Sequence, residues 1–266
     1  MRFLFRLLRG LFVAVIAVVA ALFVSIPIDG FLNRGKVETM TNTVIPSSAG
    51  NVNAFVVAPQ TDQRLPAVIM IHEFWGLKPE IIGKAEALST EGYLVVAPDT
   101  FRGQTTSWLA KAIWQTIRTP RENVNADLDA VFAWLVSQPN VDPERIMVMG
   151  FCYGGGTSLL YSLHNPEVAA TGIFYGNVGV DTSELTKLSG PVLGIFGEDD
   201  TSIPLEEVRA FEAGLEQANI PNQITIYQDK GHAFVKSIAE IERDPVQQQA
   251  WNEFLEFAET HLKDGL

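Results

Sequence analysis

The chain has 266 residues, of which 47% are hydrophobic and 19% are charged. This composition excludes a disordered chain, a collagen and a coiled coil, and the length suits one large domain or two small ones. The 31 acidic and 19 basic residues give a net charge of −12, so we do not expect a nucleic-acid-binding protein. A single cysteine, Cys152, excludes an internal disulfide and a multi-cysteine metal site.

The amino terminus is predicted to be a membrane segment. Residues 11–28 contain no charged side chain and follow Arg2, Arg6 and Arg9. A helix of this length extends ~27 Å, close to the ~30 Å hydrocarbon core of a bilayer. A good Ala-x-Ala cleavage site is missing, which favours an uncleaved transmembrane helix over a removed signal. The arginines predict a catalytic domain anchored on the non-cytoplasmic side, or secreted if the segment is cleaved.

The rest of the chain alternates short β-branched runs with amphipathic stretches. Strands are predicted at 52–57, 67–71, 94–97, 145–149, 171–175, 192–196 and 223–227, and helices at 79–91, 107–117, 123–137, 153–163, 205–218 and 246–261. This alternation predicts an α/β fold with a mostly parallel sheet covered by helices on both faces. We expect an anchor at 1–28, a linker with a first edge segment at 29–51, and one catalytic domain at 52–266.

Cys152 lies in a motif typical of a nucleophile elbow. The predicted strand at 145–149 is followed by GFCYGG at residues 150–155 and then by a helix. A sharp strand-to-helix turn exposes the nucleophile, and the glycines allow the close backbone approach that this turn requires. The first N–H groups of the helix point toward the sulfur, which favours the thiolate. Because a lone cysteine is usually a buried small side chain, the hypothesis depends on the motif around it.

Two further strand ends carry an acid and a base. Residues 197–200 read GEDD, and residues 231–234 read GHAF. A nucleophile, an acid and a base in this chain order, each after a different strand, are typical of an α/β-hydrolase. We expect Asp200, rather than Asp199, to orient His232, which takes the proton of the thiol.

A fourth motif, HEFWGL, occupies residues 72–77 at the end of the strand at 67–71. Taken together, the four motifs resemble the dienelactone hydrolase family, the carboxymethylenebutenolidases. The resemblance covers roughly residues 52–266 and does not account for the amino-terminal segment. It implies an α/β-hydrolase fold, in agreement with the alternation of strands and helices.

The resemblance also implies the roles of the site residues. It makes Cys152, Asp200 and His232 a catalytic triad, Glu73 a group that modulates the thiol, and the backbone N–H groups of Phe74 and Tyr153 the oxyanion hole. The neighbouring His72 is expected to point to the opposite side and to be structural. Trp75 is a candidate for the substrate pocket.

Members of the family bind a substrate carboxylate with two arginines, as the resemblance implies. The corresponding candidates here are Arg102 and Lys236, with lysine where arginine is expected. A lysine cannot form the planar two-bond clamp of an arginine, so we expect weaker recognition of a carboxylate.

The implied activity is hydrolysis of a small ester or lactone through a cysteine S-acyl intermediate, with no metal or organic cofactor. Neither a zinc motif on one helix nor a dinucleotide glycine fingerprint is present. A general carboxylesterase or thioesterase of the same fold is one alternative, and a thiol-based redox sensor or a binding protein is another. The expected partners are the small-molecule substrate and the membrane, and the oligomeric state is left open.

Overall fold

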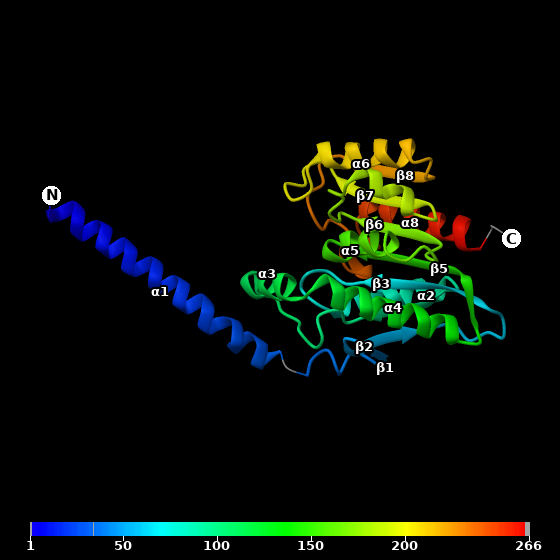
Figure 1. Ribbon diagram of the computed structural model, residues 1–266, viewed down its shortest axis with the longest axis horizontal. Helices are drawn as coiled ribbons and strands as arrows, with labels where there is room; N and C mark the ends of the chain where they lie inside the picture. Colours follow the sequence, from blue (N-terminus) through cyan, green and yellow to red (C-terminus); the bar gives the residue numbers. More distant parts are fainter. Residues whose placement is uncertain (1, 34, 264–266) are drawn as a thin grey trace.

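The computed structural model describes residues 2–33 and 35–263 (Figure 1). Its centre is an eight-stranded sheet with the strand order β1-β2-β4-β3-β5-β6-β7-β8. The strands are β1 (Thr43–Ser47), β2 (Gly50–Val57), β3 (Leu65–Ile71), β4 (Leu94–Pro98), β5 (Val141–Phe151), β6 (Ala170–Phe174), β7 (Val192–Gly197) and β8 (Asn222–Tyr227). The helices are α1 (Arg2–Leu32), α2 (Pro79–Thr90), α3 (Leu109–Arg118), α4 (Arg121–Ser137), α5 (Tyr153–Ser162), the 3-10 helix η1 (Thr182–Lys187), α6 (Leu205–Gln217), α7 (Ile238–Ile241) and α8 (Pro245–Leu262).

Parallel pairing joins the six strands from β3 to β8, and β1 and β2 add an antiparallel edge. The mostly parallel α/β fold predicted from the sequence is therefore confirmed, and each predicted strand and helix is present with small shifts at its ends. The edge strand β1 falls in the segment predicted as a linker with a first edge segment. It is short and contains Pro46, which is tolerated at an edge where one side of the strand is unpaired.

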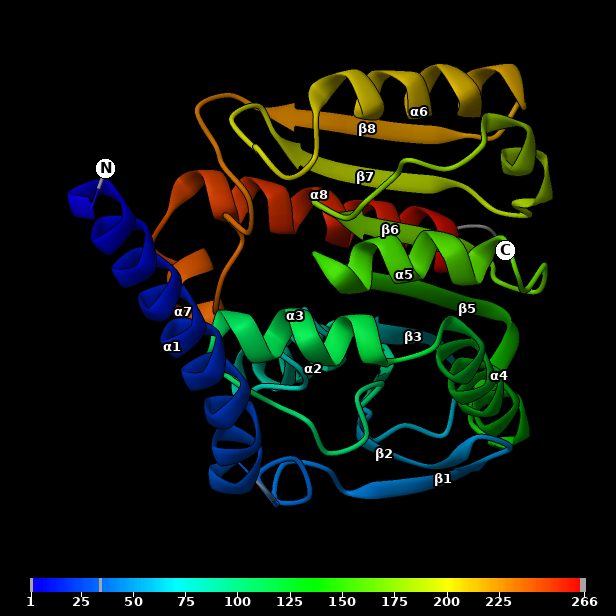
Figure 2. The same ribbon diagram turned by 60° about the vertical axis from the view of Figure 1, so that its left-hand side comes forward.

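The central strand β3 is buried along its whole length. Its side chains alternate between the two faces of the sheet, as the pleat requires. Val68 and Met70 belong to a core shared with α2 and α8, whereas Ala67, Ile69 and Ile71 pack in a core shared with α4. A third apolar cluster joins α5 and α6 to β6 and β7. Figure 2 shows helices on both faces, so the uncovered carboxyl ends of the strands are the place for a site.

Helix α1 projects from the body of the molecule and contacts α3 (Figure 1). Where they meet, Lys111 Nζ lies 3.4 Å from Asp29 Oδ2, and the lysine side chain is buried. Among the residues that the structure describes, no helix is long and apolar enough to cross a membrane. Several side chains of α1 lie outside that set. The transmembrane helix predicted over residues 11–28 is therefore not supported by the structure.

Candidate active site

Cys152 occupies a sharp turn between β5 and α5. Its backbone has φ 54° and ψ −114°, a conformation that is unfavourable for a residue with a side chain. Two glycines make the turn possible. A Cβ on Gly150 would lie 2.4 Å from the carbonyl carbon of Gly154, and a Cβ on Gly154 would lie 2.2 Å from the carbonyl oxygen of Ile71. The turn therefore has the shape that the sequence predicts for a nucleophile elbow.

The side chains of Cys152, His232 and Asp200 form a continuous hydrogen-bonded chain. His232 Nε2 lies 2.9 Å from Cys152 Sγ, and His232 Nδ1 lies 2.6 Å from Asp200 Oδ2. These residues follow β5, β8 and β7, whose carboxyl ends lie at the same edge of the sheet. The arrangement allows His232 to accept a proton from the thiol while Asp200 fixes the imidazole orientation.

The choice of Asp200 over its neighbour Asp199 agrees with the structure. Asp200 is buried, and its Oδ1 accepts hydrogen bonds from the backbone N–H groups of Ser202 at 2.7 Å and Ile203 at 3.1 Å. Asp199 is exposed. The two backbone donors hold one carboxylate oxygen, so the other is left to face His232.

The resting sulfur is in an environment that favours the thiol. Burial raises the pKa of Cys152 to about 12, and the nearby carboxylate of Glu73 acts in the same direction. Hydrogen bonds from the backbone N–H groups of Tyr153 and Phe74 lower the pKa but do not offset the burial. The start of the helix therefore favours the thiolate as expected, but desolvation of the charged sulfur outweighs this effect in the resting protein.

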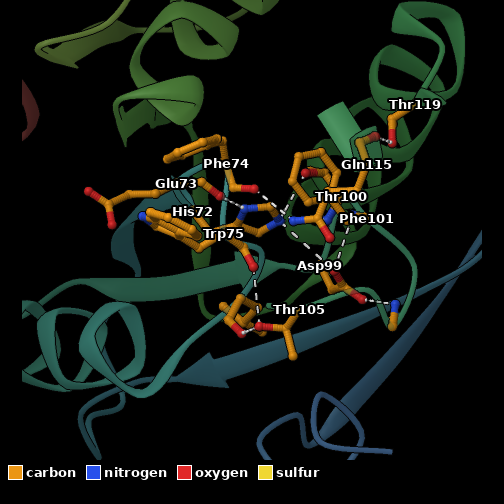
Figure 3. Close-up of polar contacts among 12 residues, drawn as sticks. His72, Glu73, Phe74, Trp75, Asp99, Thr100, Phe101, Thr105, Gln115 and Thr119 are labelled. Atoms are coloured by element: carbon orange, nitrogen blue, oxygen red, sulfur yellow. Dashed lines mark hydrogen bonds and ion pairs between the residues drawn. The ribbon is translucent and has the colours of Figure 1, made fainter. Parts of the chain in front are cut away.

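The two predicted oxyanion donors meet at the sulfur. The N–H of Tyr153 comes from the first residue of α5, and that of Phe74 comes from the loop after β3. Figure 3 shows how this loop is held from the other side, with Gln115 of α3 donating from Nε2 to the carbonyl oxygen of Phe74 at 2.7 Å. The carbonyl of Trp75 accepts from the backbone N–H of Thr106 at 2.9 Å. Both N–H groups are thus in place for a substrate oxyanion.

The three residues predicted to bind substrate lie outside this arrangement. Arg102 bonds to the carbonyl of Ala49 and forms an ion pair with Asp127 Oδ1 at 2.7 Å, which ties the turn between β1 and β2 to α4. Lys236 is exposed, and its Nζ lies 3.7 Å from Glu240. Trp75 packs against Phe74. Both cations have carboxylate partners elsewhere, so the structure does not support the expected carboxylate site.

A cavity of about 1190 Å³ opens onto Cys152 and His232. Apolar residues form much of its wall, among them Leu109, Ile113, Leu160, Tyr175 and Ile203. Arg102, Lys236 and Trp75 are absent from its described lining. Most of the lining residues come from α3, α4, α5 and the segments after β6 and β7, so the pocket is built mostly from segments that the four motifs do not include.

Tyr175 was not among the residues predicted for the site. It directly follows β6, has φ 40° and is fully buried. Its hydroxyl donates to the carbonyl of Val235 at 2.8 Å, and its ring centroid lies 5.4 Å from that of His232. Tyr175 therefore supports the loop that carries the histidine. Its place at a predicted strand end was the available signal.

The fold and the hydrogen-bonded site together define an α/β-hydrolase, with a nucleophile position after β5, an acid after β7 and a base after β8. Within the described part of the chain, no group of three or more His, Cys, Asp or Glu side chains is placed to hold a metal ion. At this edge of the sheet, the side chains of Cys152, His232 and Asp200 supply a nucleophile position, a base and an acid.

Comparison with known proteins identifies the family. Residues 52–262 match the dienelactone hydrolase family. The chain is 34% identical over 255 residues to a Salmonella typhimurium protein provisionally named a carboxymethylenebutenolidase, covering 89% of this chain and 91% of that protein. A similarly named protein of Escherichia coli is 35% identical over 209 residues, covering 72% of this chain and 76% of its own. The chain belongs to the dienelactone hydrolase family, a family of hydrolases.

A solved structure agrees with this assignment. A Klebsiella pneumoniae protein provisionally described as a dienelactone hydrolase superposes with a TM-score of 0.73 at 29% sequence identity. The match covers 81% of this chain and 96% of that protein. The family match begins at residue 52, after the end of helix α1.

Replacement of Glu73 by glutamine is expected to make the thiol more acidic. A negative charge near the sulfur disfavours the thiolate, so its removal lowers the pKa of Cys152. Because the chain contains one cysteine, the rate of iodoacetamide alkylation at pH 8 to 9 reports this thiol alone. We expect the rate to rise several-fold in Glu73→Gln and to stay constant in the exposed control Glu216→Gln. An unchanged or slower rate in Glu73→Gln contradicts the assigned effect of Glu73.

Proposed function

We propose that the protein hydrolyses a small ester or lactone through a covalent S-acyl intermediate on Cys152. The observation that carries this proposal is the hydrogen-bonded chain from the sulfur through His232 to Asp200. The two backbone N–H groups at the sulfur support it, because acyl transfer develops negative charge on an oxygen at that place. Membership of the dienelactone hydrolase family supports the same reaction class.

The acylation step begins with the thiol. Its proton passes to His232 Nε2 as the sulfur attacks the carbonyl carbon, and the carbonyl oxygen becomes an oxyanion held by the N–H groups of Phe74 and Tyr153. When the C=O bond re-forms, the bond from the carbonyl carbon to the leaving oxygen breaks. The leaving oxygen takes the proton from His232, and the acyl group remains on Cys152.

Water completes the cycle. His232 removes a proton from a water molecule, which attacks the thioester carbonyl and forms a second oxyanion in the same hole. Collapse of this intermediate breaks the C–S bond and releases the carboxylic acid. The proton on His232 returns to the sulfur, which restores the thiol at its raised pKa. Asp200 orients the imidazole throughout and does not take its proton.

A general carboxylesterase or thioesterase is the main alternative, since it would use the same site with another acyl group. A redox sensor is less consistent with the chain, because Cys152 has no second cysteine to resolve an oxidised form. Its raised thiol pKa also disfavours oxidation.

Assays of the full chain with p-nitrophenyl acetate, a dienelactone and an acyl thioester distinguish these activities. Release of product from none of the three contradicts the proposed hydrolase activity.

Removal of the sulfur is expected to abolish turnover without unfolding the chain. Cys152→Ala leaves the elbow glycines and the core unchanged, so we expect a melting temperature near that of the wild type and no measurable product. Asp200→Asn is expected to leave a weak residual rate, with kcat lower by about 10⁴-fold, because His232 is held in the wrong tautomer. Steady-state kinetics and thermal melts test both variants. Activity near the wild-type level in Cys152→Ala contradicts the proposed mechanism.

A further part of the proposal concerns the charge of the substrate and rests on the places of Arg102 and Lys236. Neither side chain is part of the described cavity wall, and each has a carboxylate neighbour. We propose that neutral esters or lactones are hydrolysed at least as well as a carboxylated dienelactone.

Lys236→Ala is accordingly expected to change kcat/KM for the carboxylated lactone by less than tenfold, or under about 1.4 kcal/mol. The measurement compares kcat/KM for a neutral ester and the carboxylated lactone in the wild type and in Lys236→Ala. A strong preference for the carboxylated lactone that collapses in the variant contradicts this description of the pocket.

We also propose that the amino-terminal segment attaches the hydrolase to a membrane, with the catalytic domain on the non-cytoplasmic side. The support comes from the uncharged run at 11–28 and the arginines before it. A second support is the distribution of exposed large apolar side chains. Among the described residues, most of these side chains lie in α1 and α3. Those of α3 are Leu109, Ile113, Trp114 and Ile117. These two helices contact each other.

A reporter fusion tests this location. With alkaline phosphatase fused to the carboxyl terminus, we expect an active, exported reporter in the membrane fraction that resists extraction at high pH. The same fusion to the chain without residues 1–28 is expected to stay inside the cell. Cytoplasmic activity of the full-length fusion, or its recovery in the extractable fraction, contradicts the proposal.

A further inference from the structure

The Phe74 N–H cannot be aimed independently of the carbonyl group of Glu73. Both groups belong to the same peptide unit, which is planar and trans, so they point in opposite directions. A side chain that holds the Glu73 carbonyl on one side therefore directs the Phe74 N–H toward the sulfur on the other side. His72 is placed to do this, because its Nδ1 lies 2.7 Å from the Glu73 carbonyl oxygen (Figure 3). The backbone N–H of Gly76 donates to the same oxygen at a longer distance of 3.0 Å.

The partners of His72 determine where its proton lies. A carbonyl oxygen can only accept, so Nδ1 must carry the hydrogen that faces Glu73. On the other side of the ring, Nε2 receives the backbone N–H of Thr100 at 3.2 Å, and a backbone N–H can only donate. His72 is therefore the neutral imidazole protonated at Nδ1.

We propose that His72, in this tautomer, is a positioning residue that aims the Phe74 N–H at the substrate oxyanion. The expected effect on kcat rests on the proposed hydrolase activity. The orientation of the Glu73–Phe74 peptide by His72 does not. His72 does not touch the sulfur or the cavity in the described contacts, and it acts through the peptide bond between Glu73 and Phe74. The motif HEFWGL thus contributes its histidine as well as its backbone donor to the site.

The surroundings keep this histidine neutral. The ring is fully buried, and burial lowers the pKa of His72 to about 4. Asp99 Oδ1 lies 3.9 Å from Nε2, but its carboxylate accepts from the backbone N–H groups of Phe101 and Gly103. Burial raises the pKa of Asp99 to about 6. The nearby carboxyl group is therefore directed at the backbone and does not draw a proton onto the imidazole.

Thr100 connects the two donors of the oxyanion hole. Its hydroxyl lies 3.0 Å from His72 Nε2, and it also forms a hydrogen bond with the side chain of Tyr153. The rings of His72 and Tyr153 are stacked with their centroids 6.0 Å apart. The segment that supplies one N–H is thus braced against the residue that supplies the other. The spacing between the two N–H donors therefore depends on the contacts among His72, Thr100 and Tyr153.

Two substitutions that place an amide at different ends of the lost ring test the proposal. In His72→Asn, the side-chain NH₂ can occupy the place of Nδ1 and donate to the Glu73 carbonyl. In His72→Gln, the NH₂ reaches the place of Nε2 instead. The control Thr105→Val removes a hydroxyl that bonds to the carbonyls of Trp75 and Leu77, in the same loop but beyond the critical peptide.

We expect His72→Asn and Thr105→Val to retain at least half of the wild-type kcat for p-nitrophenyl acetate. We expect His72→Gln to lower kcat by about tenfold to a hundredfold. This is less than the factor of about 10²–10³ for complete loss of one oxyanion donor, because the Phe74 N–H is misdirected but still present. KM is expected to change less than threefold, and alkylation of Cys152 at pH 8 to 9 is expected to slow in His72→Gln, because the Phe74 N–H then no longer lowers the pKa of the thiol. Equal kcat values for the Asn and Gln variants, or a wild-type kcat in His72→Gln, overturn the proposal.

Nitrogen-15 NMR of the wild-type protein gives a test that needs no catalysis. We expect the His72 ring to show a protonated Nδ1 and an unprotonated Nε2 at pH 7, and the Phe74 amide resonance to move in His72→Gln but not in His72→Asn. A proton on Nε2 overturns the proposal even if the variants do not fold. If the wild type hydrolyses no ester, the proposed function fails, while these spectra still decide whether His72 holds the peptide.

Discussion

Gly154 lies so close to the end of β3 that a Cβ on it would be 2.2 Å from the carbonyl oxygen of Ile71. This backbone contact brings the first turn of α5 against the loop that follows β3. As a result, the N–H of Tyr153 from one segment and the N–H of Phe74 from the other converge on one sulfur. An alanine at this position would force the helix and the strand apart, and the two donors with them. The site therefore depends first on the absence of one side chain.

The same close packing explains the chemical state of the nucleophile. A sulfur enclosed by the elbow, the loop after β3 and His232 has lost much of its water, and burial raises the pKa of Cys152 to about 12. The backbone donors would stabilise a thiolate, but they contribute less than the loss of hydration takes away. In the proposed mechanism, the protein keeps a thiol at rest and uses His232, whose Nε2 lies 2.9 Å from the sulfur, to make the nucleophile. The oxyanion donors of that mechanism then stabilise the charge that moves from sulfur to the substrate oxygen.

Local patterns were sufficient to predict most of the fold, because buried strands and amphipathic helices have distinct periods. The strand-end rule then placed Cys152, Asp200 and His232 correctly, since the carboxyl ends of parallel strands meet at one edge. Long-range contacts were not accessible in this way. The ion pair of Arg102 with Asp127 joins residues 25 positions apart, and the bond from Tyr175 to Val235 joins residues 60 apart. The four-residue helix α7 is too short to show a period.

The cavity adds a constraint on what reaches the sulfur. Its wall near the catalytic atoms includes Phe74, Tyr175 and Ile203, which offer no cation. The described lining holds two long cationic side chains. One of them, Lys187 in the last turn of η1, forms an exposed ion pair with Glu184 in the first turn of the same helix. The other, Arg121, is exposed at the start of α4, next to Glu122 in the lining. A carboxylate carried into the apolar part would lose its hydration without a buried partner, which is costly. A neutral acyl group would meet no such barrier and would gain from the burial of its apolar surface.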